Sequence, residues 1–211
     1  MSNVVFSNIK KLGVLLCAIF IISACATHVV NVQQVALDDN INYLLQPIPE
    51  NLMNTGIQTL FKVRQQDEIH QFIMQVEMTQ SSLFVSAITP EGLSLFNLDW
   101  NLKLNTLNYD NKIAIDPLRV LAELQFVLWP LSEVAKGLEQ AKVKSITDNH
   151  REISSMNGVV YQIKQQGNVS YLNNLKKNYL IEIEELERWQ LSSVKVLPKQ
   201  EQFVQNIVIT P

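Results

Sequence analysis

The chain has 211 residues, of which 47% are hydrophobic and 18% charged, and its formal net charge at pH 7 is −3. A chain of this length can bury the core of one domain. It has no basic stripe, which argues against a role in binding nucleic acid.

The N-terminus has the features of a secretory signal peptide over residues 1–24. Lys10 and Lys11 precede the apolar run Leu12–Ile22, which is too short to cross a membrane, since a spanning helix needs about 20 residues. The alternative is an uncleaved anchor helix that continues to Val30, although polar residues at 27 and 28 interrupt it. The segment contains two of the 17 basic residues and none of the 20 acidic ones, so its removal makes the chain more acidic.

The end of this segment, Ile22-Ser23-Ala24-Cys25, resembles the bacterial lipobox, where the cysteine is lipidated and the chain is cut before it. The resemblance implies diacylglycerol and palmitate on Cys25, and more than one acyl chain is what stable anchoring requires. Ala26 stands where an aspartate typically retains lipoproteins in the inner membrane. We therefore expect a lipid anchor in the outer membrane, with the protein facing the periplasm.

The remaining sequence divides into a tether, a domain and an extension. Residues 25–50 are polar with scattered aliphatic residues and end in Pro47 and Pro49, which favours a tether. A folded domain is predicted over 51–189 and a C-terminal extension over 190–211. Because Cys17 is removed with the signal peptide and Cys25 carries lipid, the domain has no disulfide and depends on its core.

The predicted domain begins with strands. In residues 70–79 the apolar side chains alternate with others at a period of two, which is typical of a strand with one buried face. Residues 82–89 predict a second strand, and the break at Pro90–Gly92 separates it from a third that ends at Trp100. Residues 102–109 complete a predicted meander.

Two helices are predicted in the middle of the domain. Asp116 is a favourable N-cap and Pro117 is favoured at the first helical position. The apolar residues that follow recur at helical spacing until Pro130 ends or kinks the helix. A second, short helix is predicted from Leu131 to about Leu138, and strand patterns return from 142 to 189.

These elements predict a mainly β (α+β) fold in which a long antiparallel sheet curls over two helices. The concave side of the sheet is the surface available to the apolar stripe of the helices. We expect an apolar cavity between them, since preformed apolar concavities are common ligand sites.

Three segments carry a family resemblance: AITPEGLSLFNLDWN, IDPLRVLAELQFVLWPL and LKKNYLIEIEELERW. They resemble a family of uncharacterised outer-membrane lipoproteins, of unknown domain function, which are often encoded in gene clusters for aryl-polyene and related polyketide lipids. That family is similar to the periplasmic lipoprotein carrier LolA and its outer-membrane receptor LolB. The resemblance implies an open, curled antiparallel half-barrel with a helical lid, and a LolA-like carrier as a partner.

The break between the second and third strands is a departure from the receptor. The LolB insertion loop has an exposed leucine in a Pro-Leu-Gly hairpin, whereas the hairpin here reads Pro90-Glu91-Gly92-Leu93. A carboxylate enters a bilayer at high cost, so Glu91 weakens the expectation of lipoprotein insertion. Leu93, one position later, is the apolar residue that would have to replace that tip.

The sequence does not predict an enzyme. The three histidines have no metal-ligand spacing, and neither a nucleophile elbow nor a Gly-rich phosphate loop occurs. The acidic run from Glu182 to Glu187 is read as a solvated strand face. No metal and no cofactor other than the lipid on Cys25 are expected.

We expect instead a protein that binds acyl or polyene lipid in its cavity and assists lipid or lipoprotein transfer to the outer membrane. The alternative is an envelope scaffold lipoprotein with a packed core, in which the same residues are ordinary core. The predicted lining residues are Phe72, Met74, Val76, Phe96, Leu98, Trp100, Trp129, Tyr161 and Tyr179. Trp129, before Pro130, is the preferred gate residue.

Overall fold

The computed structural model describes residues 28–31, 34–38, 41–113 and 115–191. The predicted signal peptide, the lipidation site Cys25 and the C-terminal extension from residue 192 lie outside the described residues. The hydrophobic core described below belongs to a single folded unit.

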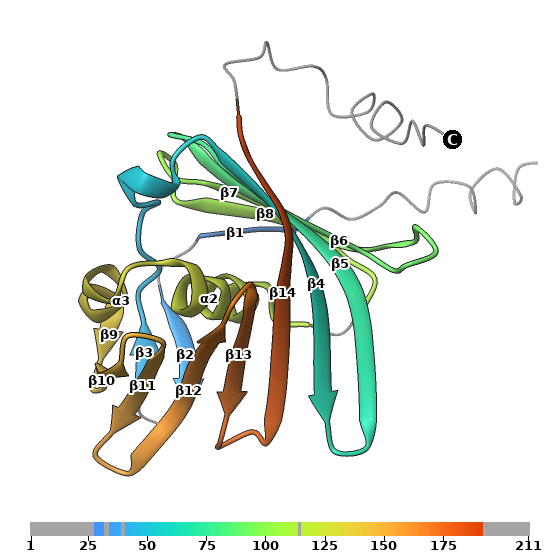
Figure 1. Cartoon of the computed structure of the whole chain (residues 1–211). Helices are drawn as coiled ribbons and strands as arrows, with labels where there is room; N and C mark the ends of the chain where they lie inside the picture. Colours follow the sequence, from blue (N-terminus) through green and yellow to red (C-terminus); the bar gives the residue numbers. More distant parts are fainter. Residues whose placement is uncertain (1–27, 32–33, 39–40, 114, 192–211) are drawn as a thin grey trace, which may run out of the picture.

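An 11-stranded antiparallel sheet forms most of the molecule, and it is not closed into a barrel (Figure 1). Its strand order is β1-β8-β7-β6-β5-β4-β14-β13-β12-β11-β10. The strands are β1 His28–Asn31, β4 Thr55–Gln65, β5 Glu68–Met78, β6 Ser82–Ile88, β7 Ser94–Asn101, β8 Thr106–Asn111, β10 Lys142–Thr147, β11 His150–Ser155, β12 Gly158–Gln166, β13 Val169–Asn174 and β14 Tyr179–Gln190.

A small second sheet and three helical segments complete the fold. The sheet contains β2 Val35–Asp38, β3 Ile41–Tyr43 and β9 Leu138–Glu139. The helical segments are η1 Glu50–Leu52, α2 Pro117–Leu128 and α3 Leu131–Gly137. The mainly β prediction, with an open curled sheet and two short helices, is confirmed.

The bounds of α2 follow from its sequence. The Asp116 carboxylate accepts hydrogen bonds from the backbone N–H groups of Leu118 (3.0 Å) and Arg119 (3.3 Å), as expected of an N-cap. Pro117 occupies the first turn, where a missing N–H costs nothing. The helix ends before Pro130, and the backbone of Trp129 is already extended.

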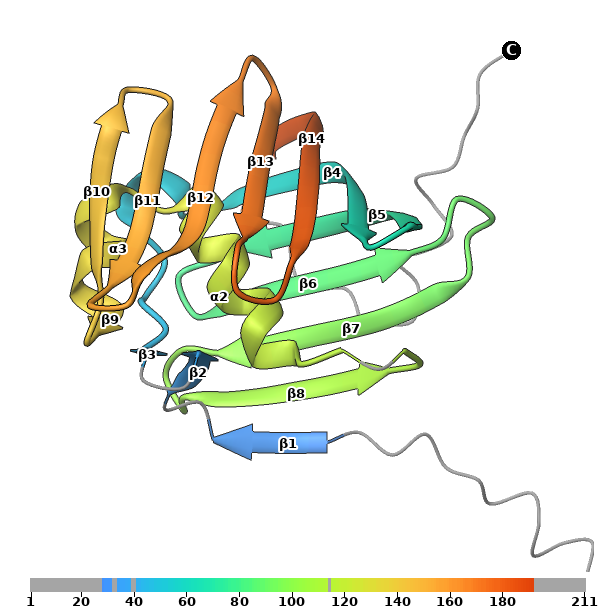
Figure 2. The same cartoon turned by 90° about the horizontal axis from the view of Figure 1, so that it is seen from below.

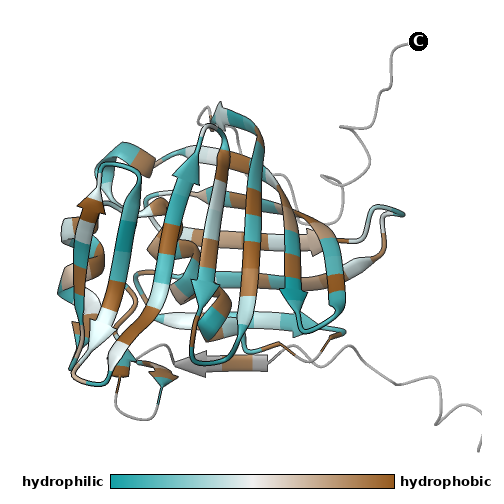
Figure 3. Cartoon of the chain, turned by 60° about the horizontal axis from the view of Figure 1, so that its bottom comes forward, coloured by the Kyte–Doolittle hydropathy of each residue, from teal (hydrophilic) through white to brown (hydrophobic). Residues whose placement is uncertain are grey.

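The sheet curls around α2, so that the helix lies inside the curve rather than on an outer layer. Viewed from below, α2 passes between β12–β14 on one side and β6–β8 on the other (Figure 2). Hydrophobic and hydrophilic residues alternate along the strands (Figure 3), so each strand turns one set of side chains toward the helix. The predicted placement on the concave side is thus seen for α2.

The segment before the first long strand differs from the expected tether. From Val35 to Ile48 it forms β2, β3 and an extended stretch that packs on the helices; we name residues 35–38 and 41–48 the strap. Its buried side chains are Val35, Leu37, Ile41, Tyr43, Leu45, Gln46 and Ile48. The strands are so short that their alternation is weak in the sequence, and the two prolines suggested an unfolded linker.

No helix within the described residues is long and apolar enough to cross a membrane.

Candidate functional site

The residues predicted to line a cavity lie on the concave face of the sheet and at the end of α2. Strand pairing forms rows of side chains across β5, β6 and β7. One row is Val76, Val85 and Leu98, and the next is Met74, Ala87 and Phe96. The whole set is buried apart from Tyr179, which is half-buried. Their inward orientation is as the alternation predicted.

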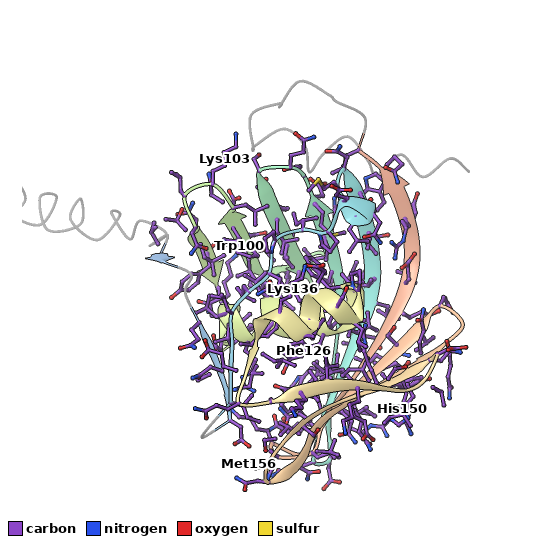
Figure 4. All side chains as sticks on the ribbon, turned by 90° about the vertical axis from the view of Figure 1, so that its left-hand side faces the viewer. Trp100, Lys103, Phe126, Lys136, His150 and Met156 are labelled. Atoms are coloured by element: carbon purple, nitrogen blue, oxygen red, sulfur yellow. The ribbon has the colours of Figure 1, made fainter. Side chains whose placement is uncertain are left out.

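These side chains fill the interior. Leu98 and Tyr161 have no exposed surface, and the exposed fraction of Phe72, the largest in the buried part of the set, is 9%. A side chain that lined a hollow large enough for hydrocarbon would keep accessible surface facing it. Phe72 instead stacks on Phe61 with ring centroids 5.4 Å apart, and in Figure 4 side chains occupy the region around Phe126 on α2.

The structure therefore differs from the expectation of a preformed apolar cavity at these positions. The cavity was inferred from the curl of the sheet and the size of the helices, whereas periodicity reports only which way a side chain points. A role of these residues in lipid binding stays a prediction, and it requires the interior to open.

Between α2 and the sheet lies a buried polar group that the sequence analysis did not single out, which we name the Glu123 cluster. Glu123 accepts hydrogen bonds from the hydroxyls of Tyr179 and Tyr161, the latter at 3.2 Å. Arg119 Nη1 donates to the Tyr161 oxygen at 3.1 Å, and Asn174 Nδ2 donates to the Tyr179 oxygen at 3.2 Å. The cluster joins one turn of α2 to β12, β13 and β14.

Burial decides the ionisation of this cluster. The exposed fraction of Glu123 is 8%, and desolvation raises the pKa of its carboxyl, while the hydrogen bond from Tyr179 and the charge of Arg119 oppose that rise. Burial and the neighbouring Glu123 also raise the pKa of Tyr179 to about 12. Both tyrosines are therefore hydrogen-bond donors at neutral pH, and the carboxyl is held in a site that disfavours its charged form.

The strap is fastened to α2 by a second set of buried hydrogen bonds. Gln125 Oε1 accepts from the Tyr43 hydroxyl (2.8 Å) and the Gln46 N–H (2.9 Å), and its Nε2 donates to the Gln46 carbonyl (2.8 Å). Arg119 Nη2 donates to the carbonyl oxygens of Ala36 (2.9 Å) and Leu37 (3.0 Å). Side chains of α2 therefore bind two partners. Gln125 and Arg119 hold the strap, and Glu123 and Arg119 contact the sheet.

Trp129, the predicted gate residue, holds the strap to the end of α2. Its exposed fraction is 1%, and its indole N–H donates to the Pro47 carbonyl at 2.8 Å. Arg151 on β11 donates to the carbonyls of Val127 (2.6 Å) and Trp129 (2.8 Å), which satisfies two of the unpaired groups at the end of α2. The gate role itself stays a prediction.

The hairpin Pro90–Leu93 connects β6 and β7 at the surface. The Thr89 hydroxyl interacts with Glu91 and lowers the pKa of its carboxyl, so Glu91 is charged at neutral pH. Gly92 adopts φ +86°, which favours glycine, and the exposed fraction of Leu93 is 67%. The tip thus presents a carboxylate next to an exposed leucine.

Glu123, Arg119, Gln125 and Arg151 were not recognised as site residues from the sequence. Glu123 and Gln125 had a visible signal in the sequence, because they are the two polar residues within the otherwise apolar run from Val120 to Trp129. Arg151 had none, since a single arginine in a strand is ordinarily solvated. Within the described part of the chain, no group of His, Cys, Asp and Glu could hold a metal ion.

Comparison with known proteins gives a family and a fold relative. Residues 56–187 match the family model described as DUF3261, protein of unknown function. A crystal structure of an outer membrane lipoprotein-sorting protein domain from Vibrio parahaemolyticus is similar, with a TM-score of 0.38 and 4% sequence identity over 69% of this chain and 88% of that chain. No curated protein matches the sequence.

Proposed function

Starting from the fact that this chain belongs to the DUF3261 family, whose function is unknown, we propose that it is a lipid-handling lipoprotein of the bacterial envelope. It is anchored through Cys25 in the outer membrane, faces the periplasm and is not an enzyme. An acyl or polyene chain enters between the concave face of the sheet and α2, and the strap, α2 and α3 act as a displaceable cover.

The observation that supports this proposal is the Glu123 cluster. An ordinary core helix docks through apolar side chains, whereas α2 docks on β12–β14 partly through a carboxyl in a desolvated site. Ionised buried groups weaken docking, because their hydration is lost on burial. A cover held in this way is easier to lift than one held by hydrocarbon alone.

The energy for opening comes from the ligand. Each methylene moved from water into an apolar environment contributes about 0.8 kcal/mol. The inner face that a lifted helix would uncover is apolar, with Phe72, Met74 and Leu98 among its residues. A long hydrocarbon chain can therefore replace the helix as the partner of the sheet.

The nature of the cargo is part of the proposal. The aryl-polyene gene-cluster resemblance suggests a polyene or acyl lipid, and the similarity to LolA and LolB suggests delivery by a LolA-like carrier. Transfer from such a carrier in a reconstituted assay tests the second point. A purified carrier that gives up no lipid or lipoprotein to this protein would remove it from the proposal.

The test of lipid binding uses the unlipidated protein, in which Cys25 is replaced by alanine and residues 1–24 are removed. We expect an acyl ligand to copurify in native mass spectrometry and a fluorescent fatty acid to bind saturably. Glu123→Gln cannot ionise and keeps an acceptor for both tyrosines, so it should slow fatty-acid uptake at pH values where the Glu123 carboxyl loses its proton. Glu184→Gln on the opposite face of β14 is the matched control and should leave uptake unchanged.

The second candidate is an envelope scaffold lipoprotein that carries no lipid, and the packed interior favours it. It predicts that no acyl ligand copurifies and that the fluorescent fatty acid does not bind. Removing residues 190–211 tests its partner surface: loss of a binding partner with unchanged ligand binding would assign the extension to a scaffold role. Saturable fatty-acid binding by the unlipidated protein would exclude a purely structural role.

A further inference from the structure

A polar hollow lies on the inner face of the sheet, beside the junction of α2 and α3, and it is separate from the packed interior. Its volume is about 260 Å³. Apolar side chains of Val127, Leu131 and Ile163 line one part of it, and polar residues of β10, β11, β12, β13 and the turn between β10 and β11 line the rest. None of the residues predicted to contact lipid borders it.

Arg151 is the one cation among the residues that line this hollow, apart from the titratable His150. No carboxylate of a described residue lies within ion-pair distance of its guanidinium, and burial lowers the pKa of Arg151. A buried charge without a counter-ion is costly, which makes it a candidate for binding an anion.

The hydrogen bonds that cap α2 use only some of the N–H donors of Arg151. Arginine has five N–H donors, and the carbonyls of Val127 and Trp129 take one each. These two acceptors are neutral, so they orient the guanidinium without neutralising it. The remaining donors are free to serve a ligand in the hollow, and the helix end keeps the planar group in a fixed position.

Neutral donors surround the arginine. Cα pairing places Ser145 and Ile163 on either side of Arg151, and Gln165 opposite Ser170, so these residues share the inner face. The Gln165 amide and the Ser170 hydroxyl complement the oxygens of an anion, whereas the Ser145 hydroxyl donates to the Thr147 carbonyl at 2.8 Å and must turn from it to reach a ligand. His150 also borders the hollow, and its buried Nε2 has no hydrogen-bond partner among the described residues, with Glu152 Oε1 3.4 Å away.

One acidic residue opposes this reading. Asp148 also lines the hollow, but it lies in the turn between β10 and β11 and is exposed. Water therefore screens its charge more strongly than it screens the half-buried Arg151.

We propose that this hollow binds an oxyanion, a phosphate or carboxylate group, through Arg151 with Ser145, Gln165 and Ser170. At about 30 Å³ for each water the volume equals roughly nine waters, which suits an anionic group with a few carbons attached. The apolar side chains would contact those carbons. The anion is either a free small molecule or the headgroup of a lipid, and its binding does not need α2 to lift.

The experiment titrates the full chain, purified in a non-ionic detergent and phosphate-free buffer, with inorganic phosphate and with hexyl phosphate. Isothermal titration calorimetry at constant ionic strength should show saturable binding of one or both. Comparable affinities identify a free anion as the ligand, whereas a tighter hexyl phosphate identifies a lipid headgroup. Hexanol is the control for binding by the alkyl chain alone.

Two variants test the site, Gln165→Glu and Arg151→Lys, and Gln166→Glu is the control. Gln165→Glu keeps the side-chain size and adds a negative charge in the hollow, and should weaken binding by about tenfold, or ~1.4 kcal/mol. Gln166→Glu adds the same charge at the next, also exposed position of β12, and should change affinity less than about twofold. Arg151→Lys keeps the charge and loses the planar fork, so it should also weaken binding.

Two results would overturn the proposal. One is the absence of saturable binding of either phosphate by a chain whose circular dichroism shows it to be folded. The other is an equal loss of affinity in Gln165→Glu and Gln166→Glu. Neither result bears on fatty-acid uptake, because that assay measures a different part of the molecule.

Discussion

Glu123 is the residue whose environment departs most from what its chemistry favours. A carboxyl of ordinary pKa 4.5 is enclosed between α2 and the sheet, where desolvation raises its pKa. Arg119, Tyr161, Tyr179 and the more distant Lys177 are the groups whose charge or hydrogen bonds act on it. The folded chain holds this proton at pH values where the unfolded chain has released it.

This linkage predicts the pH dependence of stability. The contribution of Glu123 is fully present below pH 4.5 and is lost as the pH rises through the higher pKa of the folded state. The free energy of unfolding of the wild type, relative to Glu123→Gln, should therefore fall as the pH rises above about 4.5. Urea unfolding at several pH values measures it, and a difference that grows with pH would contradict the prediction.

Gly137 marks the closest approach of α3 to the strap. The Leu44 N–H donates to the Gly137 carbonyl at 2.8 Å, and an added Cβ would overlap the Leu44 carbonyl oxygen and the Tyr43 ring. Gly137→Ala gains about 1 kcal/mol of helix propensity. Overlap with backbone cannot be relieved by a rotamer change and costs about 1–3 kcal/mol.

We therefore expect Gly137→Ala to lower the free energy of unfolding by up to about 2 kcal/mol in urea denaturation. Ser132→Ala, at an exposed position of the same helix, is the control and should change it by less than about 0.5 kcal/mol. Equal stability of the two variants would mean that the strap shifts to make room.

At the scale of elements, the strap and α2 depend on each other. The strap contributes no more than short strands of its own, and the side chain of Gln125 alone makes three of the buried hydrogen bonds that hold it on α2. Removing that side chain leaves the Tyr43 hydroxyl and both backbone groups of Gln46 without partners. Each buried group that loses its partner costs about 1–3 kcal/mol.

Gln125→Leu, which preserves the volume, should accordingly lower the free energy of unfolding by at least about 3 kcal/mol. Gln71→Leu on an exposed part of β5 provides the comparison and should have an effect below about 0.5 kcal/mol. A loss in Gln125→Leu no greater than in Gln71→Leu would show that water replaces the missing partner.

How far the sequence predicts these elements depends on their length. The strands around Phe72 and Tyr161 and the helix from Pro117 to Leu128 extend over enough residues for their period to be read, and their bounds were predicted closely. The strap could not be predicted, because β2 and β3 are too short to show a period. The filling of the interior and the Glu123 cluster could not be predicted either, since both depend on contacts between distant segments.

For the whole molecule, the matched family segment is smaller than the folded unit. The family model covers residues 56–187, but the core includes Val35, Leu37 and Tyr43 of the strap, and Trp189 lies against Gly56. A chain cut to residues 56–187 would expose the apolar surface of both helices that the strap now covers.

We predict that residues 56–187 alone give no cooperative unfolding transition and aggregate, whereas residues 28–191 unfold cooperatively. Burial of a large apolar side chain contributes about 1.5–3 kcal/mol, so loss of the strap exceeds the stability of a typical domain. Thermal unfolding followed by circular dichroism distinguishes the two. A cooperative transition in the shorter chain would show that the strap is dispensable.

The open sheet ends at β10, which pairs with β11 and has no further partner in sheet order among the described strands. This strand carries Lys142 and Lys144, and its residues are largely exposed. A second copy of the chain that paired with this edge through its own β10 would place its Lys142 and Lys144 against those of the first copy. The pairing would also remove water from these ammonium groups. This rim of positive charge therefore disfavours edge-to-edge pairing of two copies of the chain.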